Sequence, residues 1–465
     1  MLTHSIKEIA EITGGTILQG NPELSVSDVS IDSRKIKEGE GTLFVALKGI
    51  QVDGHSFINQ ALEAGASAVL ISQKIETNNS RRGVILVPDT LVALQQLAEH
   101  NRLLLDIPVV AVTGSNGKTS TKDMIASILG TCLNTLKTQG NFNNELGLPL
   151  TLLELNKAHQ AAVVEMGMRG PGEIDFLAKM TKPTGAVITN IGEAHLERLG
   201  TVKNIAYAKG EVLEHISEKG FAVLNADSPH MREQASRCRG RVWLYSIGGE
   251  ADISASNLRP ETGGVRFKVS YPGGQGEVYL PVPGSHNVAN SLAAIGVGLR
   301  LGLTFENIVQ GLKALELTQM RLEIIEVKGI TIINDTYNAS PSSTKAALEV
   351  LKETPAYRKI AVLGNMYELG DFTEQGHKEV GEAAVKAGVE HLITVGDLAK
   401  SIAQGGAGAG LAEESIYPCE NNSGAIEVLK NVLQNGDTIL VKGSRGMRME
   451  EIVHALVGQK TPLEH

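Results

Sequence analysis

The sequence predicts an α/β protein of three domains in which most strands run parallel. The chain has 465 residues, which is more than one ordinary hydrophobic core accommodates. Short apolar, β-branched runs alternate with helical segments along most of its length. One such run, Val109 to Val112, leads into the sequence Gly117-Lys118-Thr119, which is typical of a phosphate-binding loop between a strand and a helix.

The composition excludes several classes of protein. A net charge of -9 argues against non-specific binding to nucleic acid, which requires a basic face. The three cysteines share no motif spacing, so neither a disulfide framework nor a zinc site is expected. The first residues lack the pattern of a signal peptide, and no apolar run approaches the length of a membrane span. We therefore expect a cytoplasmic protein without membrane insertion, and a monomer by default.

The first domain is expected to span residues 1-83 as a small α/β unit. Ser5 and Glu8 form the S-x-x-E pattern of a capping box, which predicts a short helix after Ser5. The run Thr42 to Leu47 predicts a strand. A helix that ends near Gly65 and one more strand complete the unit.

The central domain is expected to span residues 84-317. Besides the run at Val109, three apolar runs that end in polar residues predict strands of a mostly parallel sheet: residues 161-167, 185-192 and 220-227. Because ligands bind at the carboxyl ends of such strands, the polar residues there are candidates for a site. A hairpin with the turn P-G-G-Q-G at residues 272-276, followed by a helix from Asn287, completes the domain.

The third domain is expected to span residues 318-465 and to be Rossmann-like. Apolar strands alternate with helical segments throughout it. The predicted strands are residues 329-335, 359-365, 391-396 and 437-443. The glycine-rich segment 405-410 predicts a flexible surface loop.

The phosphate-binding loop departs from the usual pattern. A standard P-loop has a glycine five residues before Gly117, and that place is held by Val112. The physical requirements for anion binding are nevertheless present: helix N–H groups, glycines that allow close approach, the Lys118 ammonium and the Thr119 hydroxyl for Mg²⁺. The alternative is a glycine-rich turn whose lysine is only solvated.

Three further residues are candidates for the site, and each has a functional and a structural interpretation. Glu165 directly follows a strand and faces the loop across the sheet, where a carboxylate can hold Mg²⁺, although a helix cap or a salt bridge is equally plausible. His195 lies just past another strand end, and a lone histidine is more often structural. Lys209 lies on a predicted helix, and taken alone it is best explained as a solvated lysine.

Polar residues near one strand end and at one helix start are candidates for nucleoside contacts. Asp335 follows a strand and Arg321 lies upstream of it, which suits a ribose or phosphate role or a plain ion pair between the two. Asn287 stands at a helix start, where capping alone explains an amide, although an amide can also bind an adenine edge.

The motifs together resemble the Mur ligase family of bacterial cell-wall synthesis. The P-loop of this family has the pattern T-G-x-x-G-K-T, which here is Thr113 to Thr119. The segment DSRKIKEGEGTLFVALKGIQVDGHSF is similar to the UDP-sugar domain of the family. GNFNNELGLPLTLL, EMGMRGPGEI, NIGEAHLERLG, AKGE and GSHNVANSLAA are similar to its ATPase domain. NDTYNASPSS, VLGNMYELGD and LVKGSRGMRME resemble one branch, which joins D-Ala-D-Ala to UDP-MurNAc-tripeptide. The resemblance covers nearly the whole chain.

The resemblance implies that ATP binds in the central domain. It assigns the phosphates to the loop residues Gly114, Ser115, Asn116, Gly117, Lys118, Thr119 and Ser120. It assigns the adenine to His286, Asn287 and Asn290, and the ribose or a phosphate to Arg321 and Asp335.

The resemblance also implies two Mg²⁺ ions and a catalytic set of Lys118, Glu165, His195 and Lys209. Thr119 and Glu165 hold the first ion, and His195 and Lys209 look like ligands of the second. Magnesium prefers oxygen ligands, so an ammonium is unsuitable. The family resolves this by carbamylation, in which CO₂ adds to the neutral amine of Lys209 and converts it into a carboxylate on a long stem.

The substrates are divided among the domains in the same way. Ser33, Arg34 and Lys48 look like the UDP end, and Asn141, Asn143 and Asn144 look like part of the central substrate cleft. Asn338 and Arg445 are the candidates for the carboxylate of D-Ala-D-Ala.

The activity implied is an ATP-dependent amide ligase that works through an acyl phosphate. Close alternatives are the sister ligase that adds the third amino acid, which usually has D-Y-A-H-x-P at Asp335 to Pro341, and a folylpolyglutamate synthase. A distant alternative is a GTPase-type switch. The chain has no guanine-binding N-K-x-D, because the candidate Asn156-Lys157-Ala158-His159 ends in histidine.

Overall fold

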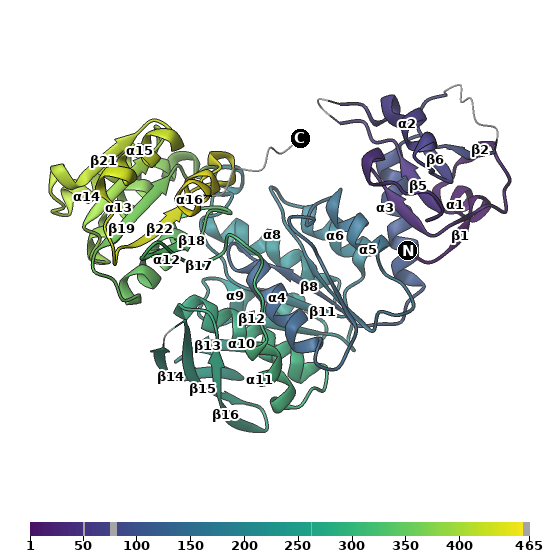
Figure 1. Cartoon of the computed structure of the whole chain (residues 1–465). Helices are drawn as coiled ribbons and strands as arrows, with labels where there is room; N and C mark the ends of the chain where they lie inside the picture. Colours follow the sequence, from purple (N-terminus) through teal and green to yellow (C-terminus); the bar gives the residue numbers. More distant parts are fainter. Residues whose placement is uncertain (50–51, 75–80, 262, 459–465) are drawn as a thin grey trace.

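The structure is a computed structural model that describes residues 1-49, 52-74, 81-261 and 263-458. Figure 1 shows the N-terminal and C-terminal parts of the chain on opposite sides of a central body. Each part contains a sheet with helices packed on it, and most neighbouring strands run parallel. The predicted fold class is therefore confirmed. No helix among the described residues is both long and apolar enough to cross a membrane.

The N-terminal part is a small α/β unit. Its elements are β1 (His4–Ser5), α1 (Ile6–Thr13), β2 (Thr16–Gln19), β3 (Ser25–Val26), β4 (Asp28–Ser30), β5 (Thr42–Val45), α2 (Ile58–Glu63), β6 (Ala68–Ile71), β7 (Gly83–Leu86) and α3 (Thr90–Leu103). The main sheet has the order β2-β7-β6-β5-β4, and only β2 is antiparallel to its neighbour. The capping box is present, since Ser5 Oγ accepts from Glu8 N–H at 3.2 Å and Glu8 accepts from Ser5 N–H at 2.7 Å.

The central part carries the sheet that positions the site. Its elements are β8 (Val109–Thr113), α4 (Lys118–Leu129), β9 (Thr135–Lys137), α5 (Gly147–Leu153), β10 (Ala161–Glu165), α6 (Glu173–Thr181), β11 (Gly185–Ile188), α7 (Leu196–Leu199), α8 (Val202–Glu214), β12 (Phe221–Asn225), α9 (Met231–Gln234), β13 (Arg241–Ile247), β14 (Ile253–Glu261), β15 (Gly264–Tyr271), β16 (Gly274–Leu280), α10 (Ser285–Arg300) and α11 (Phe305–Lys313). The strand order is β16-β15-β14-β13-β12-β11-β8-β10-β9, and neighbouring strands are parallel except in the pairs β14-β15 and β15-β16.

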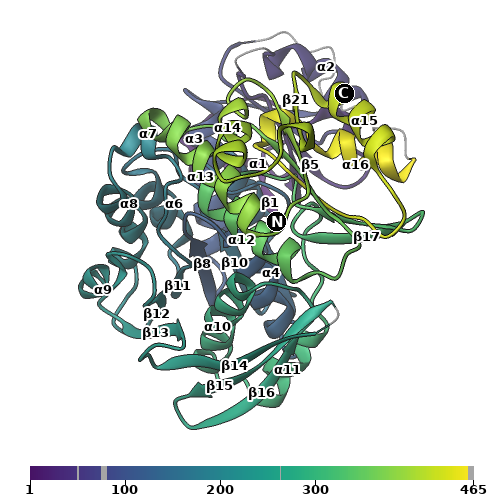
Figure 2. The same cartoon turned by 90° about the vertical axis from the view of Figure 1, so that its left-hand side faces the viewer.

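Buried residues of β8 alternate between two cores because a strand directs successive side chains to opposite faces. Val109 and Ala111 pack with α5, α6 and α8, whereas Val110 and Val112 pack with α4, α10 and α11. The predicted hairpin is confirmed, but its turn is shorter than expected. Tyr271 pairs with Gly274, so Pro272 and Gly273 alone connect β15 and β16. Figure 2 shows this hairpin at the end of the central part remote from the other two parts.

The C-terminal part is Rossmann-like. Its elements are β17 (Glu323–Val327), β18 (Ile330–Asn334), α12 (Pro341–Glu353), β19 (Lys359–Gly364), α13 (Thr373–Lys386), β20 (His391–Val395), α14 (Lys400–Gly408), β21 (Ile416–Cys419), α15 (Asn422–Val432), β22 (Thr438–Lys442) and α16 (Glu450–Val457). The strand order is β17-β18-β22-β19-β20-β21, and only β17 is antiparallel. Helices α12 to α14 cover one face and α15 and α16 the other.

The prediction of a flexible loop at residues 405-410 is wrong, because most of this segment belongs to α14. The glycines serve close packing between α13 and α14. A Cβ on Gly405 would lie 2.1 Å from the carbonyl oxygen of Lys378, and one on Gly381 would lie 2.0 Å from that of Ile402. Only residues without a side chain allow the two helices to approach this closely.

Two buried polar residues fix the junctions between the parts. Asn101, near the end of α3, donates from Nδ2 to the carbonyls of Leu152 and Leu155 at 2.8 and 3.0 Å. Asp123, on α4, accepts from Thr318 N–H at 3.0 Å and from its hydroxyl at 2.8 Å. Both ends of the central part are thereby attached to the adjoining chain. The division at residues 83 and 317 stays a prediction, and β7 lies across the first boundary.

Candidate active site

A cleft of about 800 Å³ lies between the central and C-terminal parts. It is bordered by the carboxyl ends of β8, β10, β11 and β12 and by the loops after β18, β19 and β22. The sequence-predicted residues that line it are Ser115, Asn116, Gly117, Lys118, Thr119, Ser120, Asn141, Asn143, Asn144, Glu165, His195, His286, Asn287, Asn290, Arg321, Asp335, Asn338 and Arg445. The cleft therefore gathers candidates as far apart in sequence as Ser115 and Arg445, as expected at the carboxyl edge of parallel sheets.

Five predicted residues lie elsewhere. Gly114 is buried directly before the loop, and Lys209 is buried on α8. Ser33, Arg34 and Lys48 lie on the N-terminal part and do not line the cleft. Ser33 donates its hydroxyl to Gln60 at 3.0 Å, Arg34 is paired with Asp32 at 2.9 Å, and Lys48 is exposed. Their assignment to a UDP group stays a prediction.

The geometry of the loop explains why it tolerates Val112. That residue is an interior position of β8, paired with Glu165 of β10, so no special backbone conformation is required there. The turn instead requires glycine at Gly114 and Gly117, with φ of 148° and 77°. A Cβ would lie 1.9 Å from Thr189 Oγ1 at Gly114 and 2.4 Å from Asn290 Oδ1 at Gly117. The loop is compact and ends where α4 begins, an arrangement that suits an anionic ligand.

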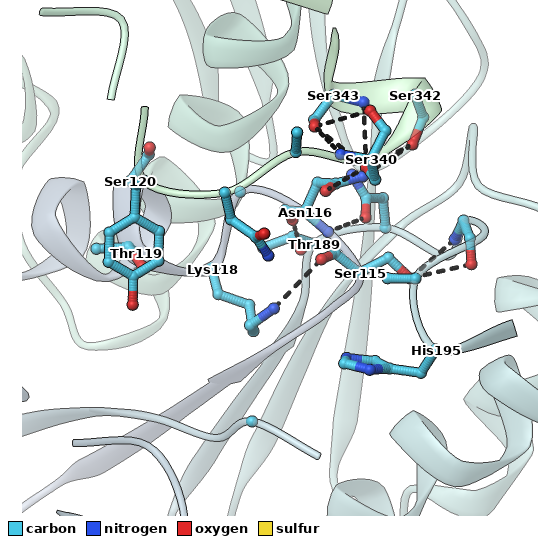
Figure 3. Close-up of a pocket in the computed structure, with 18 of the residues that line it drawn as sticks. Ser115, Asn116, Lys118, Thr119, Ser120, Thr189, His195, Ser340, Ser342 and Ser343 are labelled. Carbon is cyan, nitrogen blue, oxygen red and sulfur yellow. Dashed lines mark hydrogen bonds between the residues drawn. The ribbon is translucent and has the colours of Figure 1, made fainter. Parts of the chain in front are cut away.

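Lys118 points back into the loop. Its ammonium donates to the carbonyls of Gly114 and Ser115 at 2.8 and 3.3 Å, and Figure 3 draws the contact with Ser115 as a dashed line. Burial lowers the pKa of Lys118, and nearby Arg321 lowers it further while Glu165 opposes the shift. A cation desolvated in this way gains from an anionic ligand, because the ligand restores the charge stabilisation lost from water.

Asn116 connects the loop to both sides of the cleft. Its N–H donates to Asn190 Oδ1 at 2.8 Å, and its carbonyl accepts from Thr189 at 2.5 Å. Its side chain instead reaches the C-terminal part, donating to Ser342 at 3.0 Å and accepting from Ser340 at 3.2 Å. Figure 3 shows Asn116 between Thr189 and the turn at the start of α12.

Glu165 and Thr119 form an oxygen-rich pair suited to a hard cation. Thr119 Oγ1 donates to Glu165 Oε2 at 2.7 Å, and Asn143 Nδ2 donates to Oε1 at 2.8 Å. Glu165 is buried, with 2% of its surface exposed. Within the described residues it makes neither a helix cap nor a salt bridge, so those two explanations are not supported. A hydroxyl and a buried carboxylate fit Mg²⁺, which binds oxygen ligands.

His195 and Lys209 fit a metal less well as they stand. His195 lines the cleft, whereas Lys209 is 1% exposed and, among the described residues, donates no hydrogen bond from its ammonium. Burial and nearby Lys118 hold the pKa of Lys209 well below its usual range, which favours the neutral amine. No group of three His, Cys, Asp or Glu side chains in the described part of the chain could hold a metal ion. A carbamate on Lys209 would supply the oxygen ligands that an imidazole and an amine lack.

His195 also contacts the C-terminal part. Its Nδ1 lies 2.7 Å from Glu368 Oε2, although the two groups are not aligned for a hydrogen bond. Both residues have left-handed backbones, with φ of 66° and 64°. A positive φ is uncommon outside glycine, and it persists where the surrounding structure holds it.

The predicted adenine residues lie on the first turns of α10. Asn287 does not cap the helix, so capping does not explain the amide at this position. It donates from Nδ2 to Pro283 O at 2.8 Å, and it accepts from Asn290 at 3.2 Å. His286 stands beside them, and burial with nearby Lys442 lowers its pKa to about 4 against the opposing effect of Asp335. A pKa this low favours the neutral imidazole at physiological pH.

The predicted ion pair between Arg321 and Asp335 is replaced by other contacts. Asp335 pairs with buried Lys442 at 2.5 Å, and the same ammonium donates to Asn338 O at 2.8 Å. Arg321 lies over the ring of Tyr337, 4.1 Å from its centre, and its buried Nε has no hydrogen-bond partner within the described part of the chain. Arg321 and Asp335 both still line the cleft, where either can contact a ribose or phosphate.

Sequence reasoning missed several residues of the cleft, namely Glu193, Tyr337, Ser340, Ser342, Glu368 and Lys442. Each lies within one of the motifs that carry the family resemblance, although no role was predicted for it. Most share one signal that could have identified them, which is a position just after a strand of a parallel sheet. Among the residues that the structure describes, the buried Oε2 of Glu193 has no hydrogen-bond partner, so this carboxylate is available to a ligand.

Comparison with known families gives three consecutive matches along the chain. The model described as "Mur ligase family, catalytic domain" matches residues 25-102, "Mur ligase middle domain" matches residues 112-298, and "Mur ligase, glutamate ligase domain" matches residues 320-445. Together they span most of the sequence in the order that the fold subdivides it.

Individual relatives match over the full length. The UDP-N-acetylmuramoyl-tripeptide--D-alanyl-D-alanine ligase of Bacillus subtilis (strain 168) is 41% identical over 460 residues, covering 98% of this chain and 99% of the relative. A crystal structure of MurF from Acinetobacter baumannii is 32% identical with a TM-score of 0.90, covering 98% of this chain and 99% of that one. MurF from Thermotoga maritima in complex with ADP is 30% identical with a TM-score of 0.81, covering 93% and 98%.

Proposed function

The chain belongs to the Mur ligase family, and we propose that it joins D-Ala-D-Ala to UDP-MurNAc-tripeptide at the expense of ATP, forming UDP-MurNAc-pentapeptide in peptidoglycan synthesis. The observation that carries the proposal is the cleft, in which the phosphate loop and Glu165 face the C-terminal motifs of this branch. The full-length similarity to a relative that bears this name supports the choice within the family.

The loop from Gly114 to Ser120 binds the phosphates of ATP in this account. Its backbone N–H groups and the start of α4 provide the positive end of a helix dipole. When ATP binds, Lys118 gives up its hydrogen bond to the loop carbonyl and contacts the phosphates instead. His286, Asn287 and Asn290 border the adenine, and Arg321 and Asp335 border the ribose and phosphates.

The reaction proceeds in two steps. A carboxylate oxygen of the tripeptide attacks the γ-phosphorus of ATP, the bond to the β-phosphate oxygen breaks, and ADP leaves. The amine of D-Ala-D-Ala then attacks the acyl carbon, inorganic phosphate leaves, and the amine loses a proton as the amide forms. Positioning and neutralisation of charge supply most of the rate enhancement in phosphoryl transfer, which suits a cleft containing Lys118 and Arg321.

We propose that two Mg²⁺ ions assist this chemistry. Thr119 and Glu165 hold the first, and His195 with the carbamate of Lys209 holds the second. When bound, such ions neutralise the phosphate oxygens and orient them for in-line attack. The buried, weakly basic amine of Lys209 supports carbamylation, because only a neutral amine adds CO₂.

The remaining assignments divide the substrates among the domains. Ser33, Arg34 and Lys48 contact the UDP group, Asn141, Asn143 and Asn144 contact the peptide of the donor, and Asn338 and Arg445 contact the carboxylate of D-Ala-D-Ala. Closure of the C-terminal domain over the cleft brings the parts together and excludes water. We further infer that the enzyme acts as a monomer in the cytoplasm, where its cysteines remain reduced.

The test is phosphate release from ATP across a matrix of UDP-MurNAc peptides and amine acceptors. The proposal predicts release only when UDP-MurNAc-tripeptide and D-Ala-D-Ala are both present. Release with a single amino acid, and none with D-Ala-D-Ala, would instead indicate the sister ligase. Nucleotide hydrolysis without any UDP-sugar peptide would indicate a switch protein.

A further inference from the structure

The contact between His195 and Glu368 crosses the cleft between two domains. His195 precedes α7 of the central domain, and Glu368 lies in the loop after β19 of the C-terminal domain. The backbones touch as well, since Glu197 N–H donates to Glu368 O at 3.4 Å. A Cβ on Gly370 would lie 3.0 Å from Glu197 Cα, so the glycine permits this close approach. The loop is shaped to meet the segment that carries His195.

The C-terminal domain holds this loop rigidly. Met366 N–H donates to Nε2 of fully buried His377 at 2.9 Å. Tyr367 N–H donates to Ser444 Oγ at 3.0 Å, and Ser444 N–H donates to Asn365 O at 3.0 Å. These hydrogen bonds, made just before Glu368, fix the loop that carries its left-handed backbone, so its carboxylate moves with the domain as a whole.

The side of the imidazole that Glu368 occupies has a chemical consequence. A histidine that ligates a metal through one ring nitrogen donates the N–H of the other to a carboxylate, which fixes its tautomer and orientation. Glu368 faces Nδ1, so Nε2 is the nitrogen left for the cleft. The two groups lie at contact distance, close enough for this hydrogen bond once they are aligned.

We propose that Glu368 is a positioning residue that crosses the domain interface to hold His195 as the Nδ1–H tautomer, with Nε2 directed into the cleft. The assignment rests on the proposed function, in which His195 serves the second Mg²⁺. Because the carboxylate belongs to the C-terminal domain, His195 is oriented only while that domain is docked. The arrangement links domain closure to completion of the metal site.

The experiment compares Glu368→Ala, which removes the acceptor, with Glu368→Gln, which retains an acceptor oxygen. Glu374→Gln is the matched control, since it removes an exposed ion pair to Lys378 on the same domain. The first measurement is the tautomer of His195 by ¹⁵N NMR of the full-length, metal-free protein. The His195 signal is identified by its absence from the spectrum of His195→Gln. The second is the Mg²⁺ concentration that gives half-maximal ligase turnover.

We expect that the Nδ1–H tautomer no longer predominates in Glu368→Ala. The Mg²⁺ concentration for half-maximal turnover should rise at least about tenfold, while the KM for D-Ala-D-Ala stays unchanged. Glu368→Gln should recover part of both effects, and Glu374→Gln should match the wild type. An unchanged tautomer in Glu368→Ala, or an equal change in the control, overturns the inference. Because the tautomer is measured without substrates, the role of Glu368 is tested separately even in a protein that lacks the proposed ligase activity.

Discussion

Asn116, in the middle of the phosphate loop, donates a hydrogen bond of 3.0 Å to Ser342 at the start of α12, 226 residues away. The side chain that joins the central and C-terminal domains thus belongs to the same loop that is proposed to bind the γ-phosphate. Occupation of the loop and docking of the C-terminal domain are therefore physically connected.

Replacing Ser342 with Ala should loosen this connection. A neutral hydrogen bond contributes about 0.5–1.5 kcal/mol, so the ratio of docked to undocked molecules should fall by about two- to tenfold. Fluorescence energy transfer between labels on α11 and α15 measures this ratio, and Ser401→Ala on α14 serves as the control. Identical transfer distributions in Ser342→Ala and the wild type would show that the contact does not hold the domains.

Replacing Lys118 with Ala should remove ATP turnover. The ammonium is the positive charge that the loop directs at the phosphates, and loss of one such electrostatic contact costs about 10²–10³ in rate. Steady-state kcat with saturating substrates measures the effect, and the exposed Lys313→Ala provides a control of equal charge change. Retained turnover in Lys118→Ala would rule out the phosphate-binding assignment.

Replacing Lys209 with Ala should nearly abolish turnover. Added short carboxylic acids should restore part of it, because a free carboxylate can occupy the place of the carbamate. The measurement is turnover of Lys209→Ala against the concentration of acetate. Full activity without the acid excludes the carbamate role, whereas a loss without any rescue leaves only a packing role for this buried lysine.

His377 should make stability depend on pH. Burial lowers its pKa in the folded protein, so the unfolded chain binds the proton more readily. Its contribution to the free energy of unfolding is therefore complete above the ordinary histidine pKa of about 6.5 and is lost as the pH falls from there through the lowered pKa. Urea unfolding of His377→Gln between about pH 7.5 and about pH 5.5, one unit either side of that pKa, should show a shallower decline in the free energy of unfolding than the wild type.

The matched variant for that experiment is His230→Gln, a partly exposed histidine on the central domain. It should decline with pH as steeply as the wild type. If His377→Gln declines equally steeply, the buried imidazole is not a source of the acid sensitivity.

Much of the fold and of the cleft was predictable because parallel sheets obey simple rules. The apolar run that ends at Thr113 and the run that ends at Glu165 proved to be neighbouring strands, so their polar ends meet. A local pattern of strand, turn and helix was sufficient to locate Lys118 and Thr119 despite Val112. The resemblance to a family then added roles that spacing alone could not provide.

The errors arose where long-range contacts decide the outcome. The glycines at 405-410 looked like a flexible loop, but they lie in a helix contact whose partner is α13. Asp335 appeared to match Arg321, whereas its partner Lys442 is 107 residues away. Lys209 taken alone looked solvated, and only the packing around α8 buries it. None of these partners can be identified from neighbouring sequence.

The central claim is that the carboxylate of the tripeptide is activated by phosphorylation, and an isotope transfer experiment tests it most directly. UDP-MurNAc-tripeptide carrying ¹⁸O in its reacting carboxylate is incubated with ATP, Mg²⁺ and D-Ala-D-Ala, and the inorganic phosphate is analysed by mass spectrometry. An acyl phosphate predicts that one carboxylate oxygen leaves with the phosphate, so each phosphate released should contain one ¹⁸O. Unlabelled phosphate formed together with the pentapeptide product would contradict the account.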